Sequence, residues 1–172
     1  MKWFILCLVM IFQPASWVGK PFPAATFIDT GHNVINIEKL KGSIVVINCW
    51  SIHCGPCVAE IPDLNRLVDS FAGKNVVWLG LTYDQLPEME AFFHSQKAKE
   101  VLQMGNPAFK FRLIGDQKDF LANTLRVGVY PMTFIVGTDG IIREVIKGMS
   151  MDKDGKPKTY EKMRSALDRW MR

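Results

Sequence analysis

The residues of this chain best suited to chemistry are Cys54 and Cys57, two cysteines separated only by Gly55 and Pro56. An apolar run over 44–47 comes shortly before them and predicts a buried strand, so that Cys54 falls at the first turn of a following helix. Unpaired N–H groups and the positive end of the helix dipole stabilise a thiolate there, and only the thiolate attacks disulfides. We therefore interpret the pair as a redox-active disulfide, with Cys54 as the attacking sulfur and the more deeply placed Cys57 as the resolving sulfur.

A structural zinc site is the ordinary alternative for such a motif, and it needs a second pair of ligands. The remaining candidates are scattered singly along the chain: Cys7, Cys49, His32, His53 and His94. A disulfide kept only for stability is also disfavoured, because a two-residue loop constrains the unfolded chain very little. The pattern therefore favours redox chemistry with no metal and no cofactor.

The rest of the sequence alternates strand and helix patterns that must position these sulfurs. In chain order we expect strands over 27–29 and 34–37, a strand over 44–49, a helix over 55–71, a strand over 75–81, helix over 84–103, a short strand over 109–114, a helical stretch over 117–125, a hairpin of strands 132–136 and 141–146, and a last helix over 160–171. This series predicts an α/β fold with a central mixed sheet flanked by helices.

Several segments around the dithiol carry a resemblance to a known family. They are Gly19–Pro23, Leu40–Gly42, Asn48–Trp50, Glu60 with Pro62, and Tyr130–Ile135. Together they resemble thioredoxin-like disulfide reductases of the TlpA/ResA type, from about Gly19 to the C-terminus. The resemblance implies a thioredoxin fold with an N-terminal β-hairpin extension and a central helical insertion. Two positions depart from the family pattern, since His53 stands where Trp is usual and Met132 where Thr is usual.

Pro131 stands between a helical stretch and a strand that must pair within the sheet, where a trans proline would cost a ladder hydrogen bond. We therefore expect a cis Tyr130–Pro131 bond, with an ordinary turn proline as the alternative. In the resembled family the cis proline packs against the two sulfurs, and the residue before it holds an extended client segment by β-type pairing. The resemblance thus makes Tyr130 and Pro131 candidate client-binding residues.

Glu60 lies three residues beyond Cys57, at a spacing that brings two helical side chains together. A carboxylate in partial burial has a raised pKa and can accept the proton that Cys57 must lose. A Glu that merely complements the helix dipole is the alternative, and the resemblance favours the functional role. Asn48 occupies the strand position where thioredoxins proper carry an acid. Because an amide cannot relay a proton, that duty falls on Glu60 or on water.

Two further residues next to the dithiol are expected to contact the client. Trp50 should provide apolar cover for the site. His53 either lowers the pKa of Cys54 as an imidazolium or hydrogen-bonds the partner as a neutral ring, and the alternative is an exposed side chain without a role. We expect Cys49 to be a buried, inert thiol.

The composition, the net charge and the N-terminal segment indicate which class of protein this is. The chain has 172 residues, with 48% hydrophobic and 22% charged side chains, which suits one globular domain. Its net charge of +4 arises over 143–172, where acids interrupt the basic residues, so we expect no nucleic-acid binding. Lys2 and the apolar run over 3–12 predict a signal peptide or membrane-targeting segment over 1–19, followed by a thioredoxin-like domain over 20–172. The run has half of the ~20 apolar residues that a membrane span needs. An uncleaved membrane anchor is the alternative to a cleaved signal peptide.

The sequence thus predicts a monomeric thiol:disulfide oxidoreductase in the periplasm or on the outer face of the membrane. The Gly-Pro dipeptide between the cysteines is that of thioredoxin, whose reduction potential is about −270 mV, and it therefore favours a reductant. Protein thiols and disulfides would be its clients, a membrane electron donor would re-reduce it, and cytochrome c maturation is one pathway the resemblance implies. One alternative is a copper metallochaperone that binds Cu(I) through Cys54, Cys57 and His53 or His94. A second alternative is a thiol peroxidase, which is disfavoured because Ile47 occupies the position where such an enzyme needs proline.

Overall fold

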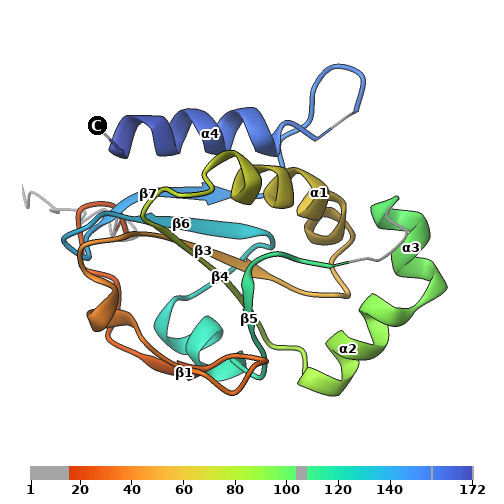
Figure 1. Ribbon diagram of the computed structural model, residues 1–172, viewed down its shortest axis with the longest axis horizontal. Coiled ribbons are helices and arrows are strands. Elements are labelled where there is room, and N and C mark those ends of the chain that lie inside the picture. The colour runs from red at the N-terminus through yellow and green to blue at the C-terminus, as the bar shows by residue number, and fades with distance from the viewer. Residues whose placement is uncertain (1–15, 104–107, 156, 172) are drawn as a thin grey trace, which may run out of the picture.

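The computed structural model describes residues 16–103, 108–155 and 157–171. A five-stranded sheet forms the centre of this part, in the order β5-β4-β3-β6-β7 (Figure 1). The strands are β3 (Ile44–Trp50), β4 (Val76–Thr82), β5 (Arg112–Ile114), β6 (Met132–Val136) and β7 (Ile142–Lys147). β3, β4 and β5 run parallel, whereas β6 pairs antiparallel with both β3 and β7. This is the mixed sheet of the thioredoxin fold, as the sequence predicts.

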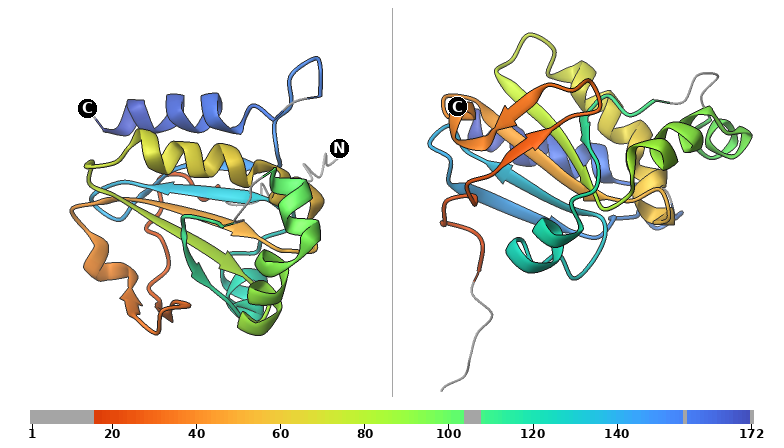
Figure 2. Two further views of the ribbon diagram at one scale, coloured as in Figure 1. Left: turned by 45° about the vertical axis from the view of Figure 1, so that its right-hand side comes forward. Right: turned by 90° about the horizontal axis from the view of Figure 1, so that it is seen from below.

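Helices and a small hairpin cover the two faces of the sheet. α1 (Gly55–Ser70) and α4 (Thr159–Trp170) lie side by side on the upper face in Figure 1. The lower face is covered by the hairpin of β1 (Thr26–Ile28) and β2 (Val34–Asn36), the 3-10 helix η1 (Ile37–Leu40) and the π-helical turn η2 (Phe120–Thr124). α2 (Leu86–His94) and α3 (Gln96–Leu102) form the helical insertion at one end, and the left view of Figure 2 shows the same layers.

The central strand β3 is buried over all seven of its residues. Val46 and Trp50 point to the face covered by α1 and α4, where the larger hydrophobic cluster lies. Ile47 and Cys49 point to the opposite face and pack with residues of the β1–β2 hairpin and η2. A strand buried on both faces is held firmly in register, so its carboxyl end is a fixed platform for whatever follows.

The helical insertion is divided where the sequence predicts one helix over 84–103. Ser95 separates α2 from α3, because its backbone is extended and its hydroxyl oxygen accepts the N–H of Ala98 at 3.1 Å. A serine in this conformation is a helix N-cap, so it ends one helix as it begins the next.

The strand predicted over 109–114 is shorter in the structure, because a side chain from α1 takes the place of a strand partner. Asn65 donates its amide to the carbonyl of Ala108 and accepts the N–H of Lys110, both at 2.8 Å. These bonds satisfy the backbone without a sheet ladder, so regular pairing begins only at Arg112.

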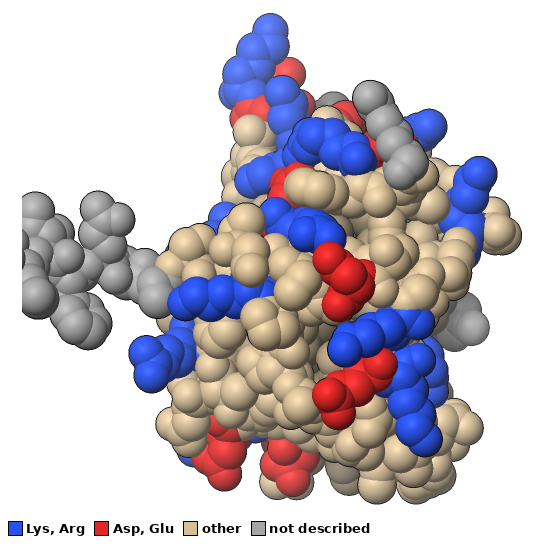
Figure 3. All heavy atoms as spheres, turned by 90° about the vertical axis from the view of Figure 1, so that its left-hand side faces the viewer, with Lys and Arg blue, Asp and Glu red and all other residues tan. Residues whose placement is uncertain are grey.

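The C-terminal segment, which carries the excess of basic residues, pairs several of them with acids. Arg169 Nη2 lies 2.7 Å from Glu144 Oε1, and Arg164 Nε lies 3.8 Å from Asp168 Oδ2. On the face of the molecule in Figure 3, basic and acidic side chains are interspersed rather than gathered by sign. Such a mixture of signs is expected of an ordinary solvated surface.

The folded domain begins before residue 20, the boundary expected from the sequence. The Trp17 ring packs edge-on against Phe134 with ring centroids 6.2 Å apart, and the N–H of Gly19 donates to the carbonyl of Ile142 at 2.9 Å. Residues 17–19 therefore make contacts of the domain itself. Residues 1–15 of the expected export segment lie outside the described residues. Over the ranges the structure describes, none of the helices has the length and apolar character needed to cross a bilayer.

Replacing Trp17 with Ala should lower the free energy of unfolding by about 1–3 kcal/mol, because it removes a half-buried ring from the core around Phe134. Val18→Ala is a matched control, since Val18 is 49% exposed, and it should change stability by less than about 0.5 kcal/mol. Urea denaturation measures both values. Equal effects of the two substitutions would show that residues 17–19 are not part of the cooperative unit.

Candidate active site

The dithiol lies at the N-terminus of α1. Cys54 is the N-cap residue, and its Sγ accepts the N–H of Cys57 at 3.2 Å. The two sulfurs form a disulfide, with Cα atoms 5.2 Å apart. Cys54 is partly exposed, whereas Cys57 is only 1% exposed. The structure thus confirms the predicted placement of one accessible sulfur and one buried sulfur, and the helix N–H that faces Cys54 would stabilise its thiolate.

A buried carboxylate, Asp84, holds the loop ahead of the dithiol. Asp84 is 2% exposed, and its oxygens accept the hydroxyl of Ser51 at 3.0 Å, the N–H of Ile52 at 2.8 Å and the hydroxyl of Thr82 at 2.7 Å. Ser51 Oγ in turn accepts the N–H of His53 at 3.0 Å. A buried side chain that accepts several hydrogen bonds fixes the groups that donate them, so this cluster ties the loop to the end of β4.

Asp84 is a site residue that the sequence reasoning missed. It is 33 positions from Ser51, and no local spacing relates the two. The sequence did hold a signal, since Asp84 comes shortly after the strand predicted over 75–81. Polar residues at the carboxyl ends of neighbouring parallel strands meet at one edge of a sheet. Thr82 belongs to the same unnoticed signal.

Glu60 is a second buried carboxylate, 3% exposed, on the far side of the dithiol. Its Oε1 accepts an N–H of Asn48 at 3.0 Å, and its Oε2 accepts the hydroxyl of Thr159 at 3.1 Å. The other N–H of Asn48 donates to Thr133 Oγ1 at 2.9 Å, while Asn48 Oδ1 accepts no hydrogen bond from the described residues. The carboxylate is therefore held between β3 and the first turn of α4.

Burial raises the pKa of Glu60 to about 7, although the hydrogen bonds from Asn48 and Thr159 and the charge of Lys162 lower it and the charge of Asp63 raises it. A carboxyl group with this pKa can both accept and release a proton near neutral pH. The sequence predicted the raised pKa from partial burial. It gave no indication of Thr159, which is 99 positions away in the chain.

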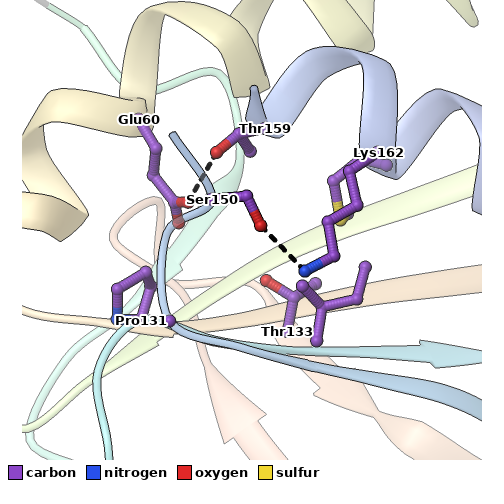
Figure 4. Close-up of a pocket in the computed structure, with 9 residues that line it drawn as sticks. Glu60, Pro131, Thr133, Ser150, Thr159 and Lys162 are labelled. Carbon is purple, nitrogen blue, oxygen red and sulfur yellow. Dashed lines mark hydrogen bonds between the residues drawn. The ribbon is translucent and has the colours of Figure 1, made fainter. Parts of the chain in front are cut away.

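A cavity of about 10 Å³ adjoins Glu60, which is about the space that one water molecule needs. Figure 4 shows Glu60 reaching toward it from α1 and Lys162 reaching toward it from α4. Its walls come from α1, β6, β7 and α4, and include Glu60, Pro131, Thr133, Ser150, Thr159 and Lys162.

The Tyr130–Pro131 bond is cis, as predicted. Pro131 is buried, and its carbonyl accepts the N–H of Gly148 at 2.7 Å. Tyr130 is partly buried against Tyr83, with the two rings edge-on and their centroids 5.8 Å apart. Burial raises the pKa of Tyr130 to about 12, so its hydroxyl stays protonated at neutral pH. Tyr83, 38% exposed, is a second aromatic residue at this site that the sequence reasoning did not mark.

Trp50, expected to contact the client as apolar cover, has no exposed surface. Its ring packs against Phe93 and Phe109, at centroid distances of 6.0 and 5.2 Å. Gly80 makes room for it, since a Cβ there would lie 3.2 Å from Trp50 Nε1. A fully buried ring offers no surface to a client, so the expectation of direct contact is corrected: Trp50 supports the site from within the core.

The other marked residues lie in three different settings. His53 is exposed next to Cys54. Cys49 is a fully buried free thiol, and burial raises its pKa, as expected of an inert cysteine. His94 lies on α2 with its Nδ1 2.7 Å from the carbonyl oxygen of Glu90 in its own helix. Among the described residues, no three His, Cys, Asp or Glu side chains gather as a metal site.

Comparison with known proteins gives one family match and several relatives. Residues 18–145 match the AhpC/TSA family. A curated relative named thiol-disulfide oxidoreductase ResA, from Bacillus thuringiensis (strain Al Hakam), is 28% identical over 131 residues, which are 76% of this chain and 70% of the relative. Another, named thiol:disulfide interchange protein DsbE, from Pseudomonas aeruginosa PAO1, is 29% identical over 140 residues, or 79% of this chain and 69% of the relative.

Solved structures share the fold at lower identity. The crystal structure of StoA from Bacillus subtilis superposes with a TM-score of 0.63 and 19% identity, covering 87% of this chain and 98% of that chain. A thiol:disulfide interchange protein of the thioredoxin family from Chlorobium tepidum superposes with a TM-score of 0.66 and 16% identity, covering 92% and 100%. These likenesses establish the thioredoxin-like architecture.

Asp84→Asn should lower the free energy of unfolding by about 1–3 kcal/mol and slow the reaction of the reduced protein with a small disulfide. The amide presents N–H groups where the carboxylate accepts three hydrogen bonds, so at least one buried donor loses its partner. Asp116→Asn is the control, because it removes the same charge from an exposed side chain. Denaturant titration and stopped-flow thiol release measure the two effects, and similar losses in both variants would contradict the assigned anchoring.

Glu60 should make stability depend on pH. Between the ordinary value of 4.5 and about 7, the folded chain binds a proton that the unfolded chain has released, so the free energy of unfolding should fall as pH rises through this window. The full loss is on the order of 3 kcal/mol. Glu60→Gln cannot titrate and should lack this loss, whereas Glu161→Gln, at an exposed position of α4, should retain it. Urea denaturation of the oxidised proteins across the window measures this, and parallel curves for wild type and Glu60→Gln would refute it.

Proposed function

The chain belongs to the AhpC/TSA family, and from that membership together with the geometry of its dithiol we propose that it is an extracytoplasmic thiol:disulfide oxidoreductase that reduces protein disulfides. The observation that carries the proposal is the pairing of the partly exposed Cys54 with the buried Cys57 at a helix N-terminus. The names of the ResA and DsbE relatives support the same class of reaction.

The reaction proceeds in two exchanges. The Cys54 thiolate attacks one sulfur of the client disulfide, and the other client sulfur leaves as a thiolate. Cys57 then gives its proton to Glu60, and its thiolate attacks Cys54 in the mixed disulfide. The Cys54–Cys57 bond forms, the bond from Cys54 to the client breaks, and the client leaves with its second sulfur as a thiolate. The protein ends in the oxidised state seen in the structure.

We assign client binding to the surface around the accessible sulfur of Cys54. We assign the backbone of Tyr130, next to the cis Pro131, to β-type pairing with an extended client segment. His53 is exposed at the other side of Cys54 and is available to a client. The exposed part of Tyr83, which packs on Tyr130, extends this surface.

The cellular setting of the proposal rests on the sequence of the first 19 residues. Lys2 and the apolar run over 3–12 have the pattern of an export signal, which would deliver the protein to a compartment where disulfides persist. There a reductant must be re-reduced by a membrane electron donor. Client cysteines awaiting haem in cytochrome c maturation are the proposed targets, and the protein is proposed to act as a monomer.

The two alternative functions have less support. A copper site would need a third ligand beside the dithiol. His94 is engaged with the carbonyl of Glu90, and His53 does not join the two cysteines in a group of three metal-ligating side chains among the described residues. A thiol peroxidase would need a free hydroxyl near a single reactive cysteine, whereas Ser51 is held by Asp84 and Cys54 is paired with Cys57. No observation favours either function, so we do not develop them.

Trapping tests the proposed function and the roles of the two sulfurs. Cys57→Ser should still attack a protein disulfide and then stall as a covalent adduct through Cys54, whereas Cys54→Ser should form no adduct and lose all reductase turnover. Mass spectrometry before and after reduction identifies the adducts, and Cys49→Ser serves as the control because that thiol is buried and unpaired. Adducts with Cys54→Ser but not with Cys57→Ser would reverse the roles, and adducts with neither would overturn the function.

A further inference from the structure

The proposed reaction leaves a proton on Glu60 at the moment when the client covers the dithiol. Glu60 is 3% exposed and Cys57 is 1% exposed, so neither can pass the proton directly to bulk water. A client paired with Tyr130 and bonded to Cys54 would cover the exposed part of the dithiol. The enzyme therefore needs a second route by which Glu60 exchanges its proton.

The cavity next to Glu60 has a lining distinct from the residues of the proposed client surface. Glu60 lines it from α1, Pro131 and Thr133 from the start of β6, and Ser150, Thr159 and Lys162 from the segment after β7 and from α4. Of these residues, Lys162 is exposed to solvent. His53, Cys54 and Tyr130 do not line it. Pro131 separates the two sides, since it lines the cavity while the residue before it lies at the proposed client surface. A space of about 10 Å³ with polar walls suits one water molecule.

We propose that this cavity is the route by which Glu60 exchanges its proton with solvent during turnover, and that Lys162 is the positioning residue at its mouth. The inference rests on the proposed function. In the resolving step the proton passes from the Cys57 thiol to the Glu60 carboxylate, and from there through the cavity water to solvent. The electron pair moves separately, from the Cys57 thiolate into the new disulfide and out onto the client sulfur.

The ammonium group of Lys162 is held at a position where its charge favours ionisation of Glu60, although the two side chains form no ion pair. Its Nζ donates to Ser150 Oγ at 2.9 Å (Figure 4), and the residue is exposed to solvent. The other charged group that acts on Glu60 is Asp63, one turn later on α1, which opposes ionisation. The hydroxyl of Thr159 completes the contacts from α4. The first turn of α4 thus governs both the ionisation of Glu60 and its access to solvent.

A pair of substitutions at Ser150 tests the route itself. Ser150→Leu should fill the cavity with apolar atoms, whereas Ser150→Ala leaves it open, and both remove the hydrogen bond to Lys162. The probe is an extended peptide whose central cysteine carries a nitrothiobenzoate leaving group. Release of the coloured thiol reports the attack by Cys54, and the decay of the peptide adduct in acid-quenched samples, followed by mass spectrometry, reports the attack by Cys57. Ser150→Leu should slow the decay by about tenfold relative to Ser150→Ala, with the attack phase unchanged.

A second pair tests the positioning role and does not depend on filling the cavity. Lys162→Met should move the pH midpoint of adduct decay, and the midpoint of the Glu60 carboxyl shift in carbon NMR of the oxidised protein, to higher pH. The direction follows because the lysine charge favours the carboxylate. Lys158→Met, at an exposed position one turn earlier, should leave both midpoints in place.

The outcomes separate this inference from the function on which it rests. If no coloured thiol is released and no adduct forms in the wild type, the proposed function fails. If attack and decay proceed normally but Ser150→Leu and Ser150→Ala decay at the same rate, the proton-exchange route is overturned. If the midpoints are the same in Lys162→Met and Lys158→Met, Lys162 has no positioning role.

Discussion

The register at the centre of the sheet determines where this site forms. β3 pairs with β4 in parallel so that Trp50 lies opposite Thr82, and with β6 in antiparallel fashion so that Cys49 lies opposite Met132. The carboxyl ends of β3 and β4 and the first residue of β6 therefore meet at one edge. The dithiol loop, the Asp84 cluster and the cis proline come together as a consequence. A slip of one residue would turn every side chain of β3 to the other face and separate them.

Two buried carboxylates flank the dithiol, and their surroundings give them different tasks. Asp84 accepts hydrogen bonds from two hydroxyls and a backbone N–H, all belonging to the chain segments it ties together. Glu60 accepts two hydrogen bonds and borders a cavity, and burial raises its pKa to about 7. The first arrangement fixes a loop. The second leaves a group that can change its protonation state without disturbing the backbone.

Local patterns in the sequence predicted the parts of the site that depend on neighbours in the chain. The helix that begins after Cys54, the burial of Cys57 and the cis bond before Pro131 follow from spacing, from residue type and from the pairing that a strand requires. The contacts of Asp84 and Thr159 could not be predicted in this way, because they join segments 33 and 99 positions apart. Trp50 was misjudged for a related reason. Its ring is covered by Phe93 of the helical insertion and by Phe109 ahead of β5, which lie 43 and 59 positions further along the chain.

The amide of Asn48 leaves Glu60 as the group that takes up the proton in the proposed reaction. An acid there would place a second titrating group beside Glu60, and the two would share their protons. Asn48 instead donates both of its N–H groups, one to Glu60 and one to Thr133, so it orients the carboxylate without competing for a proton. The titrating group nearest the resolving cysteine along α1 is then Glu60, whose other contacts come from α4. In the proposed reaction, electrons are exchanged at the edge where β3, β4 and β6 meet, whereas the proton leaves Glu60 on the α4 side, so that a bound client would not block proton exchange.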